Sequence, residues 1–452
     1  MFPNRPLRSL APALAGLLAL ACADPSTAPP SFARAPADPT VTATDPSAAP
    51  RDTTLDVRVL GTGFDNGSVA EFLLAGAVDP KVHTNSTRFV SSKELVASVT
   101  IDATAAVAFR DVAVTTTRGK KGIGTEKFLV LSIEQLGQDG GFAQDVNASG
   151  LVVGRIGQGC NGQLPATWDP AGLTSFLPLP AGGCSGWAES VNGSGVILGG
   201  IRTDPANAGR WSVARWTPIA GGYLAEFLGY WSDGSNIEAG AINAGGNLVA
   251  TAYTTPWTAL WRAPGQPWTH LSVPPGADRC VARGINDADW IVGKCYFAGV
   301  ASPVLWAGPS GSPIQLPRLA GRNSHQGAED VNNAGAIAGY AWNRAKNGAI
   351  QEMAVRWHFD GAAWQAQSLG SLGGGTSTAT AIDEDGAIVG WSTKSGANGA
   401  LTAFLWHFGG MTDLGALGPE SQALGIATGP AGRVTVGGSI VSGSWRPVRW
   451  RN

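Results

Sequence analysis

The feature that most constrains the fold is an internal repeat that occurs seven times. Each copy starts with an alternating apolar run, continues through a turn that begins with Asn or Asp, and then enters a Val/Ile-rich run. Its best-formed example is ATAIDEDGAIVG, residues 379–390, and the other copies start at residues 143, 188, 239, 282, 328 and 423. Self-similarity of this kind indicates an architecture of repeated supersecondary units.

The second half of each copy ends on a tryptophan. These residues are Trp168, Trp216, Trp261, Trp306, Trp357, Trp406 and Trp450, and successive ones lie 44 to 51 residues apart. A period near 45 residues with about four short strands per unit is typical of a propeller blade. The sequence therefore predicts an all-β chain in which residues 131–452 form a seven-bladed β-propeller.

The last copy stops at Asn452, before a fourth strand can follow. A spare strand precedes the first copy: residues 131–137, LSIEQLG, have the pattern of the fourth-strand segment 411–415. A ring closed by a strand from the other terminus has no exposed sheet edge, and an exposed edge invites aggregation. We therefore expect the strand at 131–137 to close the propeller.

The repeated Asn or Asp marks a turn. It stands at positions 147, 192, 243, 286, 332 and 383, and in most copies a glycine follows three residues later. An Asn or Asp side chain can accept a bond from the backbone two residues on, and glycine tolerates positive φ. The most repeated residues are thus expected to build the blades, and function is expected where the copies differ.

The N-terminus has the pattern of an export signal. Arg5 and Arg8 precede an apolar run that ends at Ala21, which is too short to span a bilayer as a mature helix. Ala19, Leu20 and Ala21 directly before Cys22 resemble the lipobox of bacterial lipoproteins, which implies lipidation of Cys22. The alternative is an ordinary cleaved signal with an unrelated cysteine. We expect residues 1–21 to be the signal peptide and the protein to face the periplasm or cell exterior on a lipid anchor.

Two segments separate the signal from the repeats. Residues 22–50 are rich in Pro, Ala, Ser and Thr, which predicts an extended tether. Residues 51–130 show period-two alternation with frequent turn residues, which predicts a small antiparallel β-sandwich of immunoglobulin-like type. The stretches GTGF (61–64), TRFVSSKEL (87–95) and DVAV (111–114) resemble the IPT/TIG family. That resemblance implies a spacer or interaction module without catalytic residues.

The repeats also resemble a known family. The phrases FLW (404–406), MTDLG (411–415), LGSLGG (369–374) and AIDEDGAIVG (381–390) are similar to the HAF repeats of bacterial extracellular proteins. The naming His-Ala-Phe phrase reads Thr402-Ala403-Phe404 here. The resemblance implies an exported repeat protein and carries no assigned activity.

The cysteines agree with an exported chain. Without Cys22 four remain, an even number suited to an oxidising compartment. Cys280 and Cys295 flank the turn at 286–289 and would lie nearly opposite each other in the hairpin, so we predict that they form a disulfide. Cys160 and Cys184 then pair by elimination. The five histidines do not cluster with the cysteines, and no metal site or cofactor is predicted.

Charge and acidic residues limit the function classes. A formal net charge of −2 gives no footprint for nucleic acid. Asp145, Glu189, Glu329 and Asp330 precede the repeated turns and could form an acidic ring at the axis, or be solvated hairpin positions. The carboxylates at 383–385 and at 287 and 289 could hold Ca²⁺, although ordinary turns explain them better.

Aromatic residues outside the repeat register are the remaining candidates. Trp231, Trp257, Trp268, Trp342 and Tyr296 could form a stacking surface for a ligand. The first hypothesis is a monomeric, non-enzymatic surface lipoprotein that binds a glycan or an envelope protein. The alternatives are an extracytoplasmic polysaccharide hydrolase or lyase that uses axial carboxylates, and a structural envelope scaffold. Because binding loops are where the copies diverge, the repeat does not name the ligand.

Overall fold

The computed structural model describes residues 37–138, 140–157, 159, 162–203, 210–229, 235–344, 348, 350–396 and 399–452. Within them every regular element is a β-strand, which confirms the predicted all-β class. This part of the chain contains no helix long and apolar enough to cross a membrane. The predicted signal peptide and Cys22 lie outside the described residues.

The N-terminal strands form two sheets around one hydrophobic core that contains Val57, Phe72 and Phe128. The first sheet has the order β1-β3-β7-β6, and the second contains β9-β8-β4-β5 with β2 beside β9. Their bounds are β1 (Thr40–Asp45), β2 (Ala48–Pro50), β3 (Thr53–Thr62), β4 (Val69–Leu74), β5 (Ala77–Val78), β6 (Val82–Ser91), β7 (Glu94–Ile101), β8 (Ala108–Thr115) and β9 (Lys121–Gln135). The alternation in β7 is strict, because every second side chain is buried.

The predicted tether boundary needs correction. Residues 40–50, which the composition assigned to a tether ending at residue 50, contain β1 and β2. β1 pairs with β3, and β2 pairs in parallel with β9. The physical reason is that Val41 and Thr44 are buried against the sheets, and burial by a tertiary neighbour overrides a Pro- and Thr-rich composition.

The repeats form four-stranded antiparallel sheets in which the strands follow in chain order. The first strands are β10 (Gly141–Val146), β14 (Gly183–Val191), β18 (Ile237–Ile242), β22 (Arg279–Ile285), β26 (Gln326–Val331), β30 (Gly373–Ile382) and β34 (Ser421–Gly429). The second strands are β11 (Val152–Ile156), β15 (Ile197–Thr203), β19 (Leu248–Ala252), β23 (Trp290–Phe297), β27 (Ile337–Arg344), β31 (Ile388–Lys394) and β35 (Gly432–Val441).

The third strands carry the repeated tryptophans, and the fourth strands are short. The third strands are β12 (Leu164–Trp168), β16 (Arg210–Ile219), β20 (Thr258–Arg262), β24 (Val300–Ala307), β28 (Ile350–Phe359), β32 (Leu401–His407) and β36 (Ser444–Arg451). The fourth strands are β13 (Thr174–Phe176), β17 (Gly222–Phe227), β21 (Thr269–His270), β25 (Pro313–Gln315), β29 (Trp364–Ser368) and β33 (Gly410–Gly415).

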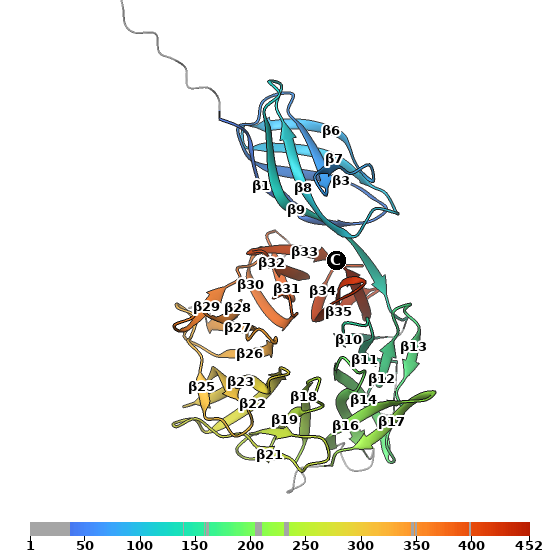
Figure 1. Cartoon of the computed structure of the whole chain (residues 1–452), viewed down its shortest axis with the longest axis vertical. Coiled ribbons are helices and arrows are strands. Elements are labelled where there is room, and N and C mark those ends of the chain that lie inside the picture. The colour runs from blue at the N-terminus through green and yellow to red at the C-terminus, as the bar shows by residue number, and fades with distance from the viewer. Residues whose placement is uncertain are drawn as a thin grey trace, which may run out of the picture. The chain divides into compact units, whose positions relative to one another are not determined.

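The sheets lie around a ring, as in a β-propeller (Figure 1). Each first strand contacts the first strand of the next sheet, and β34 of the last sheet contacts β10 of the first. The last sheet takes its fourth strand from β9, in which residues 132–135 pair with residues 448–451 of β36. The domain boundary expected at residue 130 therefore falls inside one continuous strand.

The repeated turn residue joins neighbouring sheets as well as forming its own turn. Asn192 Oδ1 accepts bonds from the Ser194 and Val196 amides, while its Nδ2 donates to the carbonyl of Asn243 in the next sheet, at 3.0 Å. Equivalent donations start from Asn147, Asn243, Asn286 and Asn332. Turn chemistry alone did not predict this chain of buried bonds, which links six consecutive turns.

Six of the seven repeated tryptophans are core residues, and Trp261 is only partly buried. Trp168, Trp216, Trp306, Trp357 and Trp450 are fully buried, and Trp406 nearly so. In three sheets the indole Nε1 donates at 2.7 Å to a carbonyl in the loop after the preceding sheet, for example Trp216 to Pro178. In these three sheets the indole ring thus fills apolar space, and the hydrogen bond from its Nε1 links one sheet to the preceding one.

Candidate functional site

A β-bulge at the same place in each first strand turns one side chain toward the centre of the ring. In β10 the register passes from Ala143 to Asp145 and skips Gln144, and in β26 it passes from Ala328 to Asp330 and skips Glu329. The other first strands have the same irregularity. A bulge leaves its extra residue unpaired and re-aims its side chain.

A glycine in the second strand makes room for most of these bulges. Gly154 lies opposite Ala143, and a Cβ atom added to Gly154 would stand 2.2 Å from the Phe142 carbonyl oxygen. A Cβ atom added to Gly339 would likewise stand 2.2 Å from the Gly327 carbonyl oxygen. Any side chain there would force the strands apart, so the glycine that ends the Val/Ile run is a requirement of the bulge.

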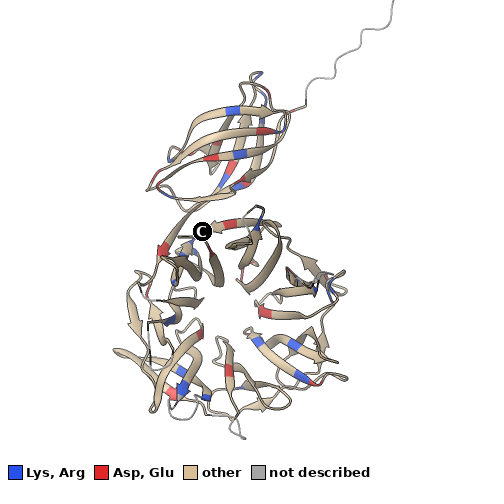
Figure 2. Ribbon diagram, turned by 180° about the vertical axis from the view of Figure 1, so that it is seen from behind, with Lys and Arg blue, Asp and Glu red and all other residues tan. Residues whose placement is uncertain are grey.

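The bulged residues line one axial cavity of about 170 Å³. The ring runs Gln144, Glu189, Gly240, Arg283, Glu329, Thr380 and Leu424, with Asp145, Ser190 and Asp330 beside it. The acidic residues suggested by sequence do meet here. The ring is nevertheless mixed in charge, because Arg283 occupies the repeat position that Glu189 and Glu329 hold in their copies. Residues of both signs also appear on the ring's strands in Figure 2.

Asp145 and Asp330 each link two neighbouring sheets through hydrogen bonds. The carboxylate of Asp145 accepts the amides of Val146 at 2.7 Å and of Val191 in the next sheet at 2.9 Å. Asp330 accepts those of Val331 at 2.8 Å and Ile382 at 2.9 Å. Burial raises the pKa of Asp145 to about 7 and that of Asp330 to about 6, against the lowering effect of these bonds.

The other charged groups form a connected network. Arg283 contacts Glu238 at 3.2 Å and Glu329 at 3.7 Å, and Lys294 contacts Glu329 at 3.8 Å. Burial alone would lower the pKa of Arg283 and of Lys294, but attraction to Glu329 and its neighbours outweighs burial and raises both. Glu189 accepts a 3.3 Å bond from Gln144, and burial raises its pKa.

Aromatic side chains continue this network away from the cavity. Tyr253 donates its hydroxyl to Glu238, and its ring lies 5.3 Å from that of Trp257. Trp257, Tyr296, His325 and Trp342 then follow with ring separations of 5.8, 6.1 and 4.7 Å. All are partly exposed. The Arg279 guanidinium lies 4.1 Å from the Tyr296 ring centre and 5.3 Å from that of Trp257.

A separate hollow of about 290 Å³ adjoins Tyr253 and Glu238. Its other walls include Trp187 and Trp211, whose rings are 4.6 Å apart in an edge-to-face arrangement. We name the combined surface the aromatic rim: Trp187, Trp211, Tyr253, Trp257, Tyr296, His325 and Trp342. Rings that are half-exposed, rigid and flanked by hydrogen-bonding groups are suited to stacking on a flat ligand.

The aromatic candidates from sequence divide into two groups. Trp257, Tyr296 and Trp342 meet in the rim. Trp268 does not: it packs beside the core of β18–β20, under Arg262, and donates to the Leu228 carbonyl. Trp231 lies outside the described residues. The candidates from sequence did not include Trp187, Trp211, Tyr253, Arg279 or His325. Tyr253, which directly follows β19, and Tyr296 of β23 share one repeat position, a signal that could have identified Tyr253.

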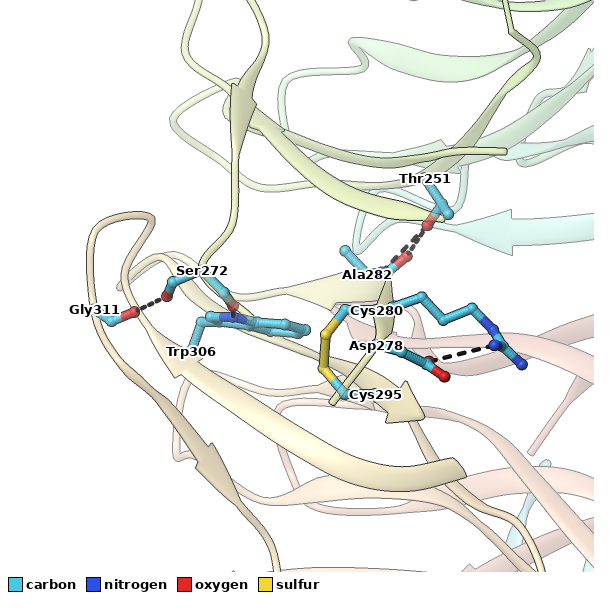
Figure 3. The surroundings of a disulfide bond; sticks show 9 residues. Thr251, Ser272, Asp278, Cys280, Ala282, Cys295, Trp306 and Gly311 are labelled. Carbon is cyan, nitrogen blue, oxygen red and sulfur yellow. Dashed lines mark hydrogen bonds and ion pairs between the residues drawn. A yellow bond between two sulfur atoms is a disulfide. The ribbon is translucent and has the colours of Figure 1, made fainter. Parts of the chain in front are cut away.

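The predicted disulfide between Cys280 and Cys295 is present (Figure 3). These residues are directly opposite each other in β22 and β23, with Cα atoms 4.1 Å apart, and both are buried. Arg279 and Tyr296 are their next neighbours in the same register. Cys184 is also disulfide-bonded, and Cys160, its expected partner, lies outside the described residues.

The carboxylates considered for Ca²⁺ are occupied by protein partners. Asp383 forms an ion pair at 2.8 Å with Arg433 of the next sheet. This ion pair links the two sheets where the other turns use the amide of an Asn. Asp289 accepts from the side-chain amides of Asn243 and Asn247. No group of three or more His, Cys, Asp or Glu suited to a metal ion occurs in the part of the chain that the structure describes.

Comparisons with known proteins add no assignment. No family model and no curated protein matches the chain. Among solved structures, the β-propeller domain of the trilobed protease from Pyrococcus furiosus matches with a TM-score of 0.44 and 12% identity, covering 69% of this chain and 93% of that one. A Hadza microbial sialidase matches at 0.38 and 8%, covering 92% and 94%. A protein of unknown function from Bacteroides thetaiotaomicron matches at 0.35 and 10%, covering 92% and 99%. With TM-scores below 0.5, these similarities do not bear on the activity of this chain.

Proposed function

We propose that this protein is an exported, lipid-anchored binding protein without catalytic activity, and that its seven-bladed propeller binds a glycan at the aromatic rim. The observation that carries the proposal is the assembly of Trp257, Tyr296 and Trp342 beside Arg279 and the axial ion pairs. Sugar rings present an apolar face that stacks on aromatic side chains, and their hydroxyls need donors and acceptors around that face.

The N-terminal module fits this role as a spacer. Its resemblance to the IPT/TIG family and the resemblance of the repeats to the HAF family support a place outside the cytoplasm. The mature protein would then be held at the membrane by acyl chains on Cys22. A Cys22→Ser variant should move from the membrane fraction to the soluble exported fraction, and equal retention of the variant would contradict the anchor.

The rim is tested on a polysaccharide and glycan array with mature wild-type protein. A Trp257→Ala/Tyr296→Ala variant should lose at least tenfold in affinity for the glycan that wild type selects, about 1.4 kcal/mol or more. Trp268→Ala is the matched control, because it removes an aromatic ring outside the rim and should retain binding. If folded wild type selects no glycan, or if the rim variant binds as well as wild type, the proposal fails.

A second candidate function, that of an extracytoplasmic polysaccharide hydrolase or lyase, is favoured by one observation. The pKa of Asp145, about 7, is that of a group able to donate a proton near neutral pH. Against it, both Asp145 oxygens accept backbone amides, and Glu329 is engaged by Arg283 and Lys294. Release of reducing ends from an array-selected polysaccharide, abolished in Asp145→Asn, would establish the enzyme instead.

A further inference from the structure

A second aromatic hollow, of about 530 Å³, is lined by Trp290 at the start of β23, by the turn at residues 334–336, and by residues of β28 and β29. From β28 and β29 these are Arg356, His358, Phe359 and Trp364. The Trp290 and Trp364 rings are 6.3 Å apart, and Phe359 lies 5.9 Å from Trp364. Tyr296 of the rim lies six positions after Trp290 in β23, so these two residues are about 20 Å apart along the strand.

The repeat explains what is unusual about Arg356. The residue before the repeated tryptophan is arginine in three copies: Arg215, Arg356 and Arg449. Arg215 lies opposite Glu226 and is ion-paired with it, and Arg449 lies opposite Glu134 and is ion-paired with it. Arg356 lies opposite Gln367. The sheet β26–β29 thus keeps the arginine and lacks the carboxylate that neutralises it in the other two sheets.

Two buried nitrogen atoms at the hollow have no hydrogen-bond partner among the described residues. Arg356 Nε is buried and has no hydrogen-bond partner there, and the same holds for His358 Nδ1. The guanidinium has an aromatic neighbour, Trp406, with its carbon 5.8 Å from the ring centre. Asp360 follows His358 and Phe359 closely, but its carboxylate accepts from Ala362, Ala363 and Gln365. A half-buried cation without a counter-charge is costly unless an anion is supplied.

Trp290 is a feature of the fourth copy alone. At this position of the turn the fifth and sixth copies have Ala336 and Ala387, so the large ring is specific to the fourth copy. The ring packs over the next turn, where a Cβ atom on Gly335 would come within 2.8 Å of it. Glycine at position 335 therefore leaves room for the indole, which lines the hollow.

We propose that this hollow binds a uronic acid residue of an acidic polysaccharide, with the carboxylate on Arg356 and His358 and the sugar ring against Trp290 and Trp364. A guanidinium and a carboxylate form charge-assisted, often bidentate hydrogen bonds. The paired tryptophans favour a sugar over a small inorganic anion, because they supply apolar faces that a phosphate ion would not use. The site shares a ligand class with the proposed function and none of the residues of the rim.

The test uses the mature protein and isothermal titration with oligouronates of galacturonate, glucuronate or mannuronate, with oligomers of galactose as neutral counterparts. Wild type should bind at least one oligouronate at least tenfold more tightly than the neutral oligomer, and inorganic phosphate alone should bind more weakly still. No uronate binding, or tighter binding of phosphate than of every oligouronate, overturns the proposal.

The decisive variant is Gln367→Glu, which restores the carboxylate found opposite the arginine in the other two sheets. The variant should fold, because the same Arg–Glu pair is present in the other two sheets. Its affinity for oligouronate should be at least tenfold lower than that of wild type. Gln367→Met, similar in size and uncharged, is the control and should retain binding. Arg356→Leu, which copies Leu305 and Leu405, should abolish the preference for acidic over neutral sugar.

Failure of this site is distinguishable from failure of the rim. Trp257→Ala/Tyr296→Ala should bind oligouronates as wild type does, whereas Trp290→Ala should lose them and keep the array-selected glycan. If Gln367→Glu binds oligouronate as tightly as Gln367→Met, Arg356 is not the recognition group and the inference is wrong.

Discussion

Single polar side chains hold neighbouring repeats together in this molecule. The sequence marks Asn147, Asn192 and Asn332 as turn residues, and their Oδ1 atoms do serve the turn. Their Nδ2 atoms also donate to the next sheet. One amide thus supplies an acceptor to its own repeat and a donor to the next, which explains why Asn is preferred over Asp in most copies.

Asn192→Asp separates these two roles. Aspartate keeps the turn acceptor but loses the donor to the Asn243 carbonyl, and it places a buried negative charge beside that oxygen. We expect a loss of about 1–3 kcal/mol in the free energy of unfolding, measured by urea titration. Asn85→Asp, at an exposed bond to Thr100, is the control and should change stability by about 0.5 kcal/mol or less. Equal effects at the two positions would refute the link between sheets.

The pKa of Asp145 predicts how stability depends on pH. The carboxyl has a pKa of about 7 in the fold against 3.8 ordinarily, mainly through burial. The folded protein therefore binds this proton more tightly than the unfolded chain between those values. The resulting stabilisation is present below the ordinary pKa and is lost as the pH rises through about 7.

Asp145→Asn should remove this contribution. The melting temperature of wild type should fall from pH 5 to pH 8 by more than that of the variant, by on the order of 2 °C. Differential scanning calorimetry at the two pH values checks this. A variant with the same or a steeper fall would show that the carboxyl does not carry the dependence.

At the scale of strands, the bulge decides which residues form the site. Period-two alternation predicts an inward or outward face for each residue of a first strand. The extra residue breaks that alternation at its own position, so Gln144, Glu189 and Glu329 point to the axis although pattern alone makes them edge positions. The repeat pattern predicts acids just before the turns and gives no indication of Arg283, which the same bulge brings among them.

The disulfide cross-links β22 and β23 next to two rim residues. Replacing Cys280 and Cys295 with alanine should reduce the free energy of unfolding by about 3 kcal/mol, from the loop-closure entropy of the 15-residue separation. The loosened register of Arg279 and Tyr296 should also weaken glycan binding at the rim. Urea unfolding and titration of the double variant check both effects. Unchanged affinity together with reduced stability would show that the cross-link does not position the rim.

At the scale of the whole molecule, closure of the ring depends on β9. The strand continues from the N-terminal sheets into the last sheet, where Glu134 pairs with Arg449, whose side chain is 1% exposed. Both the register and the ion pair join residues more than three hundred positions apart in the chain. The expected closing strand at 131–137 occupies this position.

Truncation tests closure. A fragment of residues 131–452 should remain monomeric, whereas one of residues 141–452 leaves β36 as an open edge and Arg449 without Glu134. The shorter fragment should aggregate or melt at a temperature several degrees lower, since an unpaired strand edge templates association and a buried charge loses its partner. Light scattering and thermal melts compare the two. Identical behaviour would show that β9 is dispensable.

The sequence by itself determined the all-β class, the repeat with its turns and buried tryptophans, and the disulfide between Cys280 and Cys295, because each of these is encoded by local spacing within one repeat. It also pointed to Trp257, Tyr296 and Trp342. Only the tertiary structure decided which side chains meet at the axis, which carboxylates are engaged by amides or cations, and that Arg356 faces Gln367 where its sister arginines face glutamates. Those contacts depend on bulges, strand register and the closing of the ring, which bring together residues a whole repeat or more apart and therefore leave no trace in any single stretch of sequence.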